Sequence, residues 1–509
     1  MLKNAILGNI PNIKSNSKSN KSKNHNKKTS KKLKKQLKKT DKLASVNTDT
    51  NSIIEINTAK SNKLNNVINI ILCIILFIIP LLITPREIDT PPYNLLKIIT
   101  LLLCGAILLV CVIIKIVKKE FKLDLIDKTL LVFYALIVIS TIFSTNKVKA
   151  LIGEDNRYEG FLTLTVYFLT YYCAKYYFNY NKKLKYFAIA TVIISSVIGI
   201  LQYYNIFPLY YIFNIPFKES FASSTFGNRN FFGSFLAIAV PLFMALYLIK
   251  NKKVYLVTSF IAFWGMLVSM TRSSWLGLIV VTIFGIIYIV KNYNKEILTR
   301  TIHIIIGFIL IFIFVLIPPP FITNNIGQNS LFNRFLDLGE DFDSFMNGSA
   351  DGIDMAGSGR IHIWKLTLKG IAVQPLIGPG PDNLVDGLAH NLPYECLEYV
   401  DKYKAFFDKA HNEYLQIAAT IGIPALIVYL AFVAQILGKQ KNLFKDNASF
   451  IFTISIISYL VQAFLNISTI GVAPIFWCLL GLVQNEEFKK ELVWILNKLN
   501  GQHSLIYSY

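Results

Sequence analysis

The chain has 509 residues, of which 53% are hydrophobic and only 16% are charged. Because a soluble protein of this length carries more charge, the composition excludes the soluble classes and indicates that a lipid bilayer surrounds most of the chain. The net charge of +22 does not indicate a nucleic-acid partner, because the basic residues lie in the N-terminal segment and in short connections between apolar segments. We therefore expect an integral membrane protein that binds no nucleic acid.

Residues 1–65 are polar, low in complexity and rich in lysine, most densely from Lys14 through Lys42. Such a segment buries too little apolar surface to fold alone, so it is predicted to be a disordered, basic cytoplasmic tail. The first apolar segment starts near Val67, too far from the N-terminus to be read as a secretory signal peptide.

The rest of the chain predicts an all-α polytopic membrane protein with about 12 transmembrane helices. Nine of these helices fall within residues 66–318 and three within residues 414–485, and a cytoplasmic tail follows over residues 486–509. The predicted spans are 67–84, 94–117, 128–144, 159–178, 185–204, 230–249, 253–270, 274–290, 301–318, 414–436, 448–466 and 470–484.

Alternate connections between these spans are rich in lysine, which assigns them to the cytoplasmic side. They include Lys118–Lys122, Lys182–Lys183, Lys250–Lys253 and Lys439–Lys441. This pattern predicts a multi-pass protein of the cytoplasmic membrane with both termini in the cytoplasm. The large loop, residues 319–413, then faces outward. Between Pro318 and Asn412 there are 12 acidic and 7 basic residues, and this acidic excess fits the outer side.

Two arginines stand where the predicted outer face meets the membrane or the large loop. Arg272 lies in a tight turn between two spans, where a guanidinium group must pair, reach water or meet an anion; interfacial anchoring beside Trp275 is the structural alternative. Arg360 follows a glycine-rich turn and begins an apparent amphipathic helix, Ile361–Val373, and a solvated loop charge is its alternative.

His411 closes the large loop directly before a predicted span, which would hold its imidazole at the membrane surface. A helix cap or a surface residue is the structural alternative. His362 and His390 are weaker candidates because they lack this anchoring. The acidic run Glu340–Asp343 has no second cluster with which to hold a divalent cation, so a solvated loop is favoured and no metal site is predicted.

In combination, these segments resemble the O-antigen ligase and polymerase superfamily of membrane glycosyltransferases. The resemblance extends from Gly153 to Ile436 and rests on the order of several short motifs, each of them weak alone. These motifs are Gly153–Gly160, Gly227–Phe231, Thr271–Gly277, Arg360–Trp364, Gln374–Asn383 and His411–Gln416, with Gly422 after the last.

The resemblance implies a GT-C-like fold, in which short helices of the large outer loop close an outward pocket. It also implies transfer of a glycan from an undecaprenyl diphosphate carrier to a hydroxyl of a glycan, lipid or protein acceptor, without metal or cofactor. Arg272 and Arg360 would then grip the diphosphate, with Arg157 and Arg229 as further candidates, and His411 would be the general base. Direct displacement would invert the anomeric carbon.

Two other functions stay open from the sequence. A polysaccharide chain polymerase would use a second lipid-linked glycan as the acceptor. A polysaccharide flippase or secondary transporter belongs to a different class, and the scarcity of ionisable residues within the spans together with the size of the outer loop argue against it.

Overall fold

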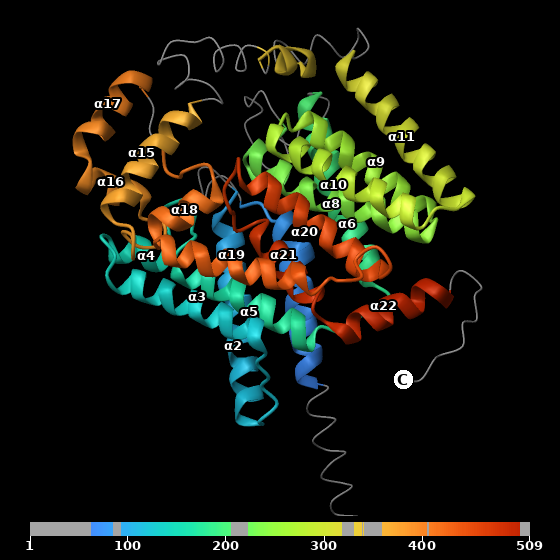
Figure 1. The fold of residues 1–509 in the computed structure, drawn as a ribbon, viewed down its shortest axis with the longest axis horizontal. Coiled ribbons are helices and arrows are strands. Elements are labelled where there is room, and N and C mark those ends of the chain that lie inside the picture. Colours follow the sequence, from blue (N-terminus) through green and yellow to red (C-terminus); the bar gives the residue numbers. More distant parts are fainter. Residues whose placement is uncertain are drawn as a thin grey trace, which may run out of the picture. The chain divides into compact units, whose positions relative to one another are not determined.

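The computed structural model describes residues 63–84, 93–204, 222–317, 330–337, 339, 359–404 and 407–498. Within these ranges every regular element is a helix and no strand occurs (Figure 1). The predicted N-terminal tail up to residue 62 and the acidic run Glu340–Asp343 lie outside the described residues.

The helices coincide closely with the predicted apolar segments. They are Lys63–Leu81, which ends in a π turn at Ile74–Ile78 and a 3-10 turn at Ile79–Leu81, α2 (Leu95–Val117), α3 (Leu125–Ile142), α5 (Phe161–Tyr177), α6 (Leu184–Tyr203), α8 (Arg229–Lys250), α9 (Lys253–Val268), α10 (Arg272–Lys291), α11 (Lys295–Leu316), α19 (Ile423–Gly438), α20 (Asn447–Ala463) and α21 (Ala473–Leu482). Shorter or more polar elements are α4 (Lys147–Ile152), a 3-10 turn at Ser224–Phe226, α15 (Arg360–Val373), α16 (Leu384–Asn391), α17 (Pro393–Tyr403), α18 (Glu413–Thr420) and α22 (Glu486–Lys498).

Seven helices of the described residues are long and apolar enough to cross a bilayer. They are Lys63–Leu81, α2, α3, α6, α8, α10 and α11, and the apolar helices α9, α19, α20 and α21 are shorter. These lengths agree with the all-helical polytopic fold that the sequence predicts. The count of twelve spans stays a prediction.

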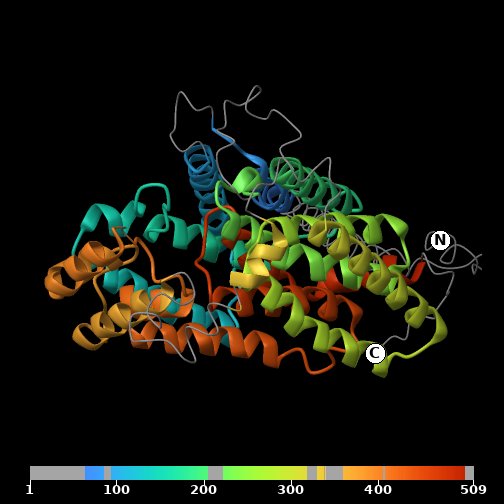
Figure 2. The ribbon, with the colours of Figure 1, turned by 90° about the horizontal axis from the view of Figure 1, so that it is seen from above.

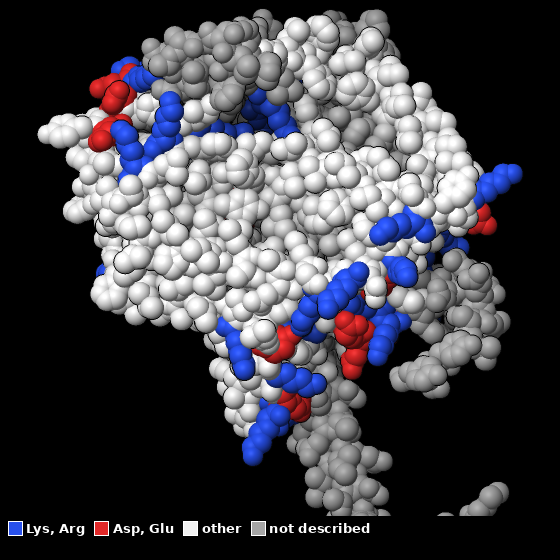
Figure 3. All heavy atoms as spheres, in the orientation of Figure 1, with Lys and Arg blue, Asp and Glu red and all other residues white. Residues whose placement is uncertain are grey.

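The surface also fits a membrane protein. In Figure 3 a broad band without charged side chains runs across the molecule over α19 and α20, with Lys, Arg, Asp and Glu gathered above and below it. Large apolar side chains are exposed on the membrane helices, as at Leu103, Ile279, Leu310 and Ile427. Exposing so much apolar surface to water would be energetically unfavourable, whereas contact with lipid is not.

Two groups of helices build the core. In one group α5 packs against α2, α3 and α21, and in the other α8 packs against α9, α10 and α20. α8 is the most enclosed of the candidate spans, with 83% of its apolar window buried, whereas α11 lies at the edge with 11% buried (Figure 2). The first residues of α8 are therefore held in place by neighbours on several sides.

The predicted span 414–436 is divided into α18 and α19 by a turn at Gly422. Gly422 has φ +107°, and a Cβ atom there would lie 2.2 Å from the carbonyl oxygen of Leu376, so only glycine fits. The large loop crosses at this turn: the backbone N of Ile423 donates to the Pro375 carbonyl (2.8 Å), and the backbone N of Gly380 donates to the Thr420 carbonyl (2.9 Å). The break is thus one of the points at which the loop is bonded to the helical bundle.

Three helices of the large loop, α15, α16 and α17, form a small core of their own beside α18 (Figure 1). α15 confirms the helix that the sequence predicts after Arg360, although Leu368 and Val373 are exposed on it. The buried apolar side chains shared by this core include Ile363, Leu366, Leu388, Tyr399, Phe407 and Ala418. Because Ala418 belongs to α18, this packing fixes the loop helices on the segment that follows His411.

Candidate active site

The N-termini of α8 and α10 lie side by side and bring Arg229 and Arg272 together. Each arginine is the first residue of its helix. The Thr271 hydroxyl donates a hydrogen bond to the Arg229 carbonyl (2.8 Å), and Gly233 leaves room for this contact, because a Cβ atom there would lie 2.5 Å from Thr271. The two arginines are far apart in the sequence and lie together only because their helices are in contact in the fold.

Two further arginines complete a cationic cluster around Arg229. Arg272, Arg334 and Arg360 all lie close enough to act electrostatically on its guanidinium group. Asp337 lies among them, 3.1 Å from Arg334 and 3.9 Å from Arg272. The side chains come from α8, α10, the helical turn 331–337 and α15, so four separate segments supply one positive site.

The turn 331–337 is fixed over α10 by aromatic packing. The Trp275 and Phe335 rings stack with centroids 5.5 Å apart. Trp275, which the sequence left open as an interfacial anchor, thus holds the segment that carries Arg334. Three of the four arginines also begin α8, α10 and α15, where the unpaired N–H groups of a helix N-terminus favour an anion.

Arg157 lies beside this cluster in the turn between α4 and α5. It forms an ion pair with Asp408, and its guanidinium carbon lies 5.2 Å from the centre of the Phe231 ring. A cavity of about 340 Å³ opens next to both members of the pair, and Gly227 and Asn228 also line it. Arg157 therefore borders a space that a small polar group can enter.

The backbone on both sides of His411 is fixed. The indole N–H of Trp364 donates to the Ala410 carbonyl (2.9 Å), and the backbone N of Ala410 donates to the Gln416 side chain (2.8 Å). On the other side the Asn412 side chain caps α18. His411 itself has φ +51°, a left-handed conformation that is unfavourable for a residue with a side chain and persists only where the surroundings enforce it.

The electrostatic environment keeps the His411 imidazole neutral. Burial and then the charge of Arg360 lower its pKa to about 4, with smaller contributions from Arg157 and Lys409, whereas Asp408 opposes the shift. Its Nδ1 atom is buried and has no hydrogen-bond partner in the described part of the chain. A neutral imidazole has a lone pair with which to accept a proton.

Lys409, two residues before His411, belongs to a buried ionic network. Lys409 pairs with Asp382, and its amino group lies 3.5 Å from Glu159. The second oxygen of Asp382 accepts hydrogen bonds from the backbone N of Glu154 (2.7 Å) and of Glu159 (3.2 Å). Burial lowers the pKa of Lys409, but the two carboxylates outweigh burial and raise it above its usual value, so the lysine stays charged.

Glu413 adds a second buried carboxyl group at the start of α18. Its two oxygens accept hydrogen bonds from the hydroxyls of Tyr429 (3.4 Å) and Tyr459 (3.1 Å). Burial raises its pKa to about 7. The segment around His411 is thus anchored from three sides by polar contacts inside the protein.

The alternative histidines lie elsewhere in the large loop. The Nδ1 atom of His362 lies 3.1 Å from the Tyr403 hydroxyl, and its ring packs edge-on against Tyr399 and Tyr403. His390 is exposed near the end of α16. Neither environment matches that of His411 beside the arginines, although these contacts do not test catalytic roles.

Sequence reasoning missed Arg334, Asp382, Asp408 and Lys409. Two signals were available, since Asp382 follows the proline–glycine motif that begins at Pro375, and Asp408 and Lys409 stand just before His411. Neither signal indicates a partner, because Asp382 and Glu159 meet only in the fold. The arginines Arg157, Arg229, Arg272 and Arg360, together with His411, were named from the sequence; the fold gathers them, while their roles stay predictions.

Comparison with known proteins supports the family independently of this geometry. A family model described as O-antigen ligase matches residues 257–430, which include Arg272, Arg360 and His411. A relative from Acinetobacter baylyi (strain ATCC 33305 / BD413 / ADP1), the ComP-specific O-oligosaccharyltransferase, is 24% identical over 359 residues. The alignment covers 66% of this chain and 58% of that protein. The family model and this relative both support the resemblance to the O-antigen ligase superfamily that was found from the sequence.

Proposed function

We propose that this protein transfers a glycan from undecaprenyl diphosphate to an acceptor hydroxyl at the outer face of the cytoplasmic membrane. The observation that carries the proposal is the convergence of Arg272, Arg360 and His411, from separate segments of the matched family region, on one partly buried site. The relative's name, an O-oligosaccharyltransferase, supports transfer of an oligosaccharide. The donor, the acceptor and the side of the membrane are parts of the proposal.

The arginine cluster suits a departing diphosphate. As the bond from the anomeric carbon to the diphosphate oxygen breaks, its electron pair moves to that oxygen and negative charge accumulates there. Planar guanidinium groups bind such oxygens in a two-pronged geometry, and in a partly buried site this attraction is stronger than in water. In our proposal Arg272 and Arg360 hold the diphosphate, and Arg157 and Arg229 are further candidates for binding it.

His411 is proposed to accept the proton of the attacking hydroxyl. The acceptor oxygen bonds to the anomeric carbon from the face opposite the diphosphate, so the configuration inverts, and the proton passes to the neutral imidazole. Arg360 disfavours the resulting imidazolium in the empty site. A bound diphosphate would offset that charge, so donor binding should raise the basicity of His411 and prepare it for the acceptor.

The test is transfer of a defined lipid-linked glycan by purified variants, with donor binding measured separately. His411→Ala should slow transfer by about 10² to 10⁴, the usual contribution of a general base, and leave donor binding nearly intact. His362→Ala and His390→Ala serve as matched controls from the same loop. A His411→Ala protein at the wild-type rate would refute the base assignment, and loss of donor binding would move His411 to the diphosphate site.

The same assay separates a ligase from a polymerase. In ligation the product loses the carrier lipid to the acceptor, whereas in polymerisation the lengthened glycan keeps it. We propose ligation, which the family description and the relative's name support. A product that keeps its lipid would establish polymerisation, and movement of intact lipid-linked glycan across vesicles without a new glycosidic bond would indicate a flippase.

A further inference from the structure

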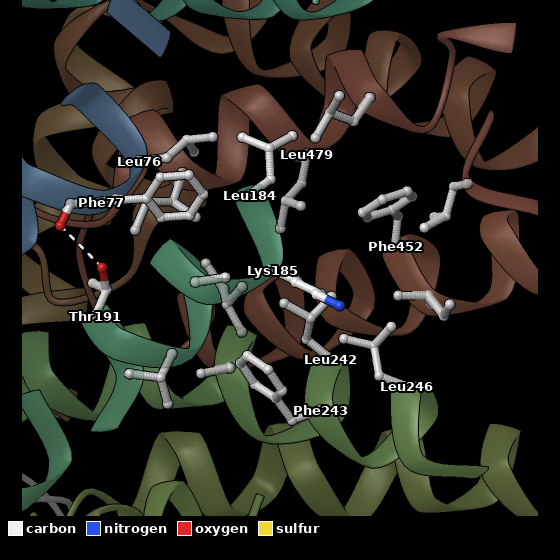
Figure 4. A pocket seen from close by; sticks show the side chains of 18 of the residues that line it. Leu76, Phe77, Leu184, Lys185, Thr191, Leu242, Phe243, Leu246, Phe452 and Leu479 are labelled. Carbon is white, nitrogen blue, oxygen red and sulfur yellow. Dashed lines mark hydrogen bonds between the residues drawn. The ribbon is translucent and has the colours of Figure 1, made fainter. Parts of the chain in front are cut away.

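A second cavity, of about 500 Å³, lies within the helical bundle and is distinct from the arginine site. Its wall is mainly apolar and comes from the first membrane helix, α6, α8, α20 and α21, as Leu76, Leu242, Phe452 and Leu479 show in Figure 4. α8 connects the two sites: its first residue, Arg229, belongs to the arginine cluster, and its last residue, Lys250, lines the second cavity. At 1.5 Å per residue the two side chains stand about 30 Å apart along the bundle.

The polar groups of this cavity gather at the Lys250 end of α8. The charged residues that line it among the described residues are Lys182, Lys185 and Lys250, and no carboxylate is among them. Glu491 approaches the rim, where it accepts a hydrogen bond from the backbone N of Tyr180 (3.2 Å), but does not line the cavity. One end of an otherwise apolar chamber is therefore cationic.

Of the three lysines, Lys250 gives the strongest evidence for an anionic ligand. It is only 5% exposed, and its amino group has no hydrogen-bond partner in the described part of the chain. A buried ammonium group without a partner is strongly unfavourable, so such groups are normally paired with an anion. In Figure 4 the amino group of Lys185 points into the cavity toward Leu242 and Leu246, so a second cation faces the same space.

We propose that this cavity binds an anionic phospholipid, with part of its acyl chains in the apolar chamber and its phosphate beside Lys250 and Lys185. The volume lies within the range of pockets that enclose small ligands. Basic pockets between membrane helices bind anionic lipid headgroups, and the surrounding bilayer supplies phospholipid. The lysine connections at this end are predicted to face the cytoplasm, so the lipid would come from the inner leaflet.

The experiment measures thermal stability of the full chain, purified and stripped of lipid, as phosphatidylglycerol or phosphatidylcholine with identical acyl chains is added. A ligand that binds only the folded protein raises the unfolding temperature. Phosphatidylglycerol should stabilise the wild type more than phosphatidylcholine does. Lys250→Gln and Lys185→Gln should each weaken phosphatidylglycerol binding about fivefold, since one basic side chain contributes about 1 kcal/mol to binding an anionic lipid.

Lys183→Gln is the matched control, because Lys183 is exposed in the same connection and does not line the cavity. It should respond to phosphatidylglycerol like the wild type. Lys250→Gln should also unfold at a higher temperature than the wild type without lipid, because it removes a buried charge. Equal stabilisation by the two lipids, or an unchanged response of Lys250→Gln, would overturn the site. Stronger stabilisation by undecaprenyl phosphate, or equal stabilisation by inorganic phosphate, would overturn the phospholipid assignment.

Discussion

Replacing Lys409 by methionine tests whether the buried network holds the site together. The lysine side chain is 3% exposed and lies between Asp382, at 0%, and Glu159, at 8%. Methionine keeps the length of the side chain but leaves two carboxylates buried without their cation. Removing one member of a buried pair costs about 3–5 kcal/mol of unfolding free energy. We expect a loss of that size, together with slower glycan transfer, because Lys409 stands two residues before His411.

The assay is reversible unfolding in mixed micelles, and Lys149→Met is the control. Lys149 pairs with Glu154 and Asp386 on the protein surface, 30% exposed, where an ion pair contributes about 0–1 kcal/mol. The double variant Lys409→Met/Asp382→Asn should recover part of the loss, because it removes one uncompensated charge. If Lys409→Met costs no more than Lys149→Met, the network does not hold the site and the reasoning fails.

Four further predictions follow from the site and the topology. Single cysteines near Ser344 and Lys252, in a cysteine-free background, should differ in labelling by an impermeant thiol reagent on intact cells; labelling only at Lys252 would reverse the orientation. Transfer by the purified protein should survive EDTA, and activity that is lost with the chelator and returns with magnesium or manganese would contradict an arginine-based site. Arg272→Lys and Arg360→Lys should each slow transfer by about 10- to 100-fold, because one charge-assisted hydrogen bond contributes about 1.5–3 kcal/mol; full activity would mean that positive charge alone suffices. The His411 imidazole should titrate near pH 4 in the donor-free protein, staying neutral above that pH, and move upward with a bound diphosphate; NMR of histidine-labelled protein, with His411→Ala for assignment, would show a value near 6.5 if burial and Arg360 do not act on it.

Helix positions, and His411 as a candidate residue, were accessible from the sequence because they depend on local pattern. Apolar runs of span length located the membrane helices from Lys63–Leu81 to α21, and the glycine-rich turn before Arg360 located the start of α15. The ordered motifs indicated the superfamily before any contact was known. These signals are short-range, since each is contained within one segment of the chain.

Contacts between distant segments were decided only by the tertiary structure. Gly422 and Pro424 are a local signal for a break, but the turn packs against the carbonyl of Leu376 in the large loop, and no pattern within the predicted span 414–436 indicates that partner. Lys409 meets Glu159 across 250 residues of sequence. The proposed lipid cavity likewise needs several helices at once, from the first membrane helix to α22. Apolar patterning determines which segments enter the bilayer, but packing determines which buried charges meet, because a charge is tolerated there only beside the partner that the fold supplies.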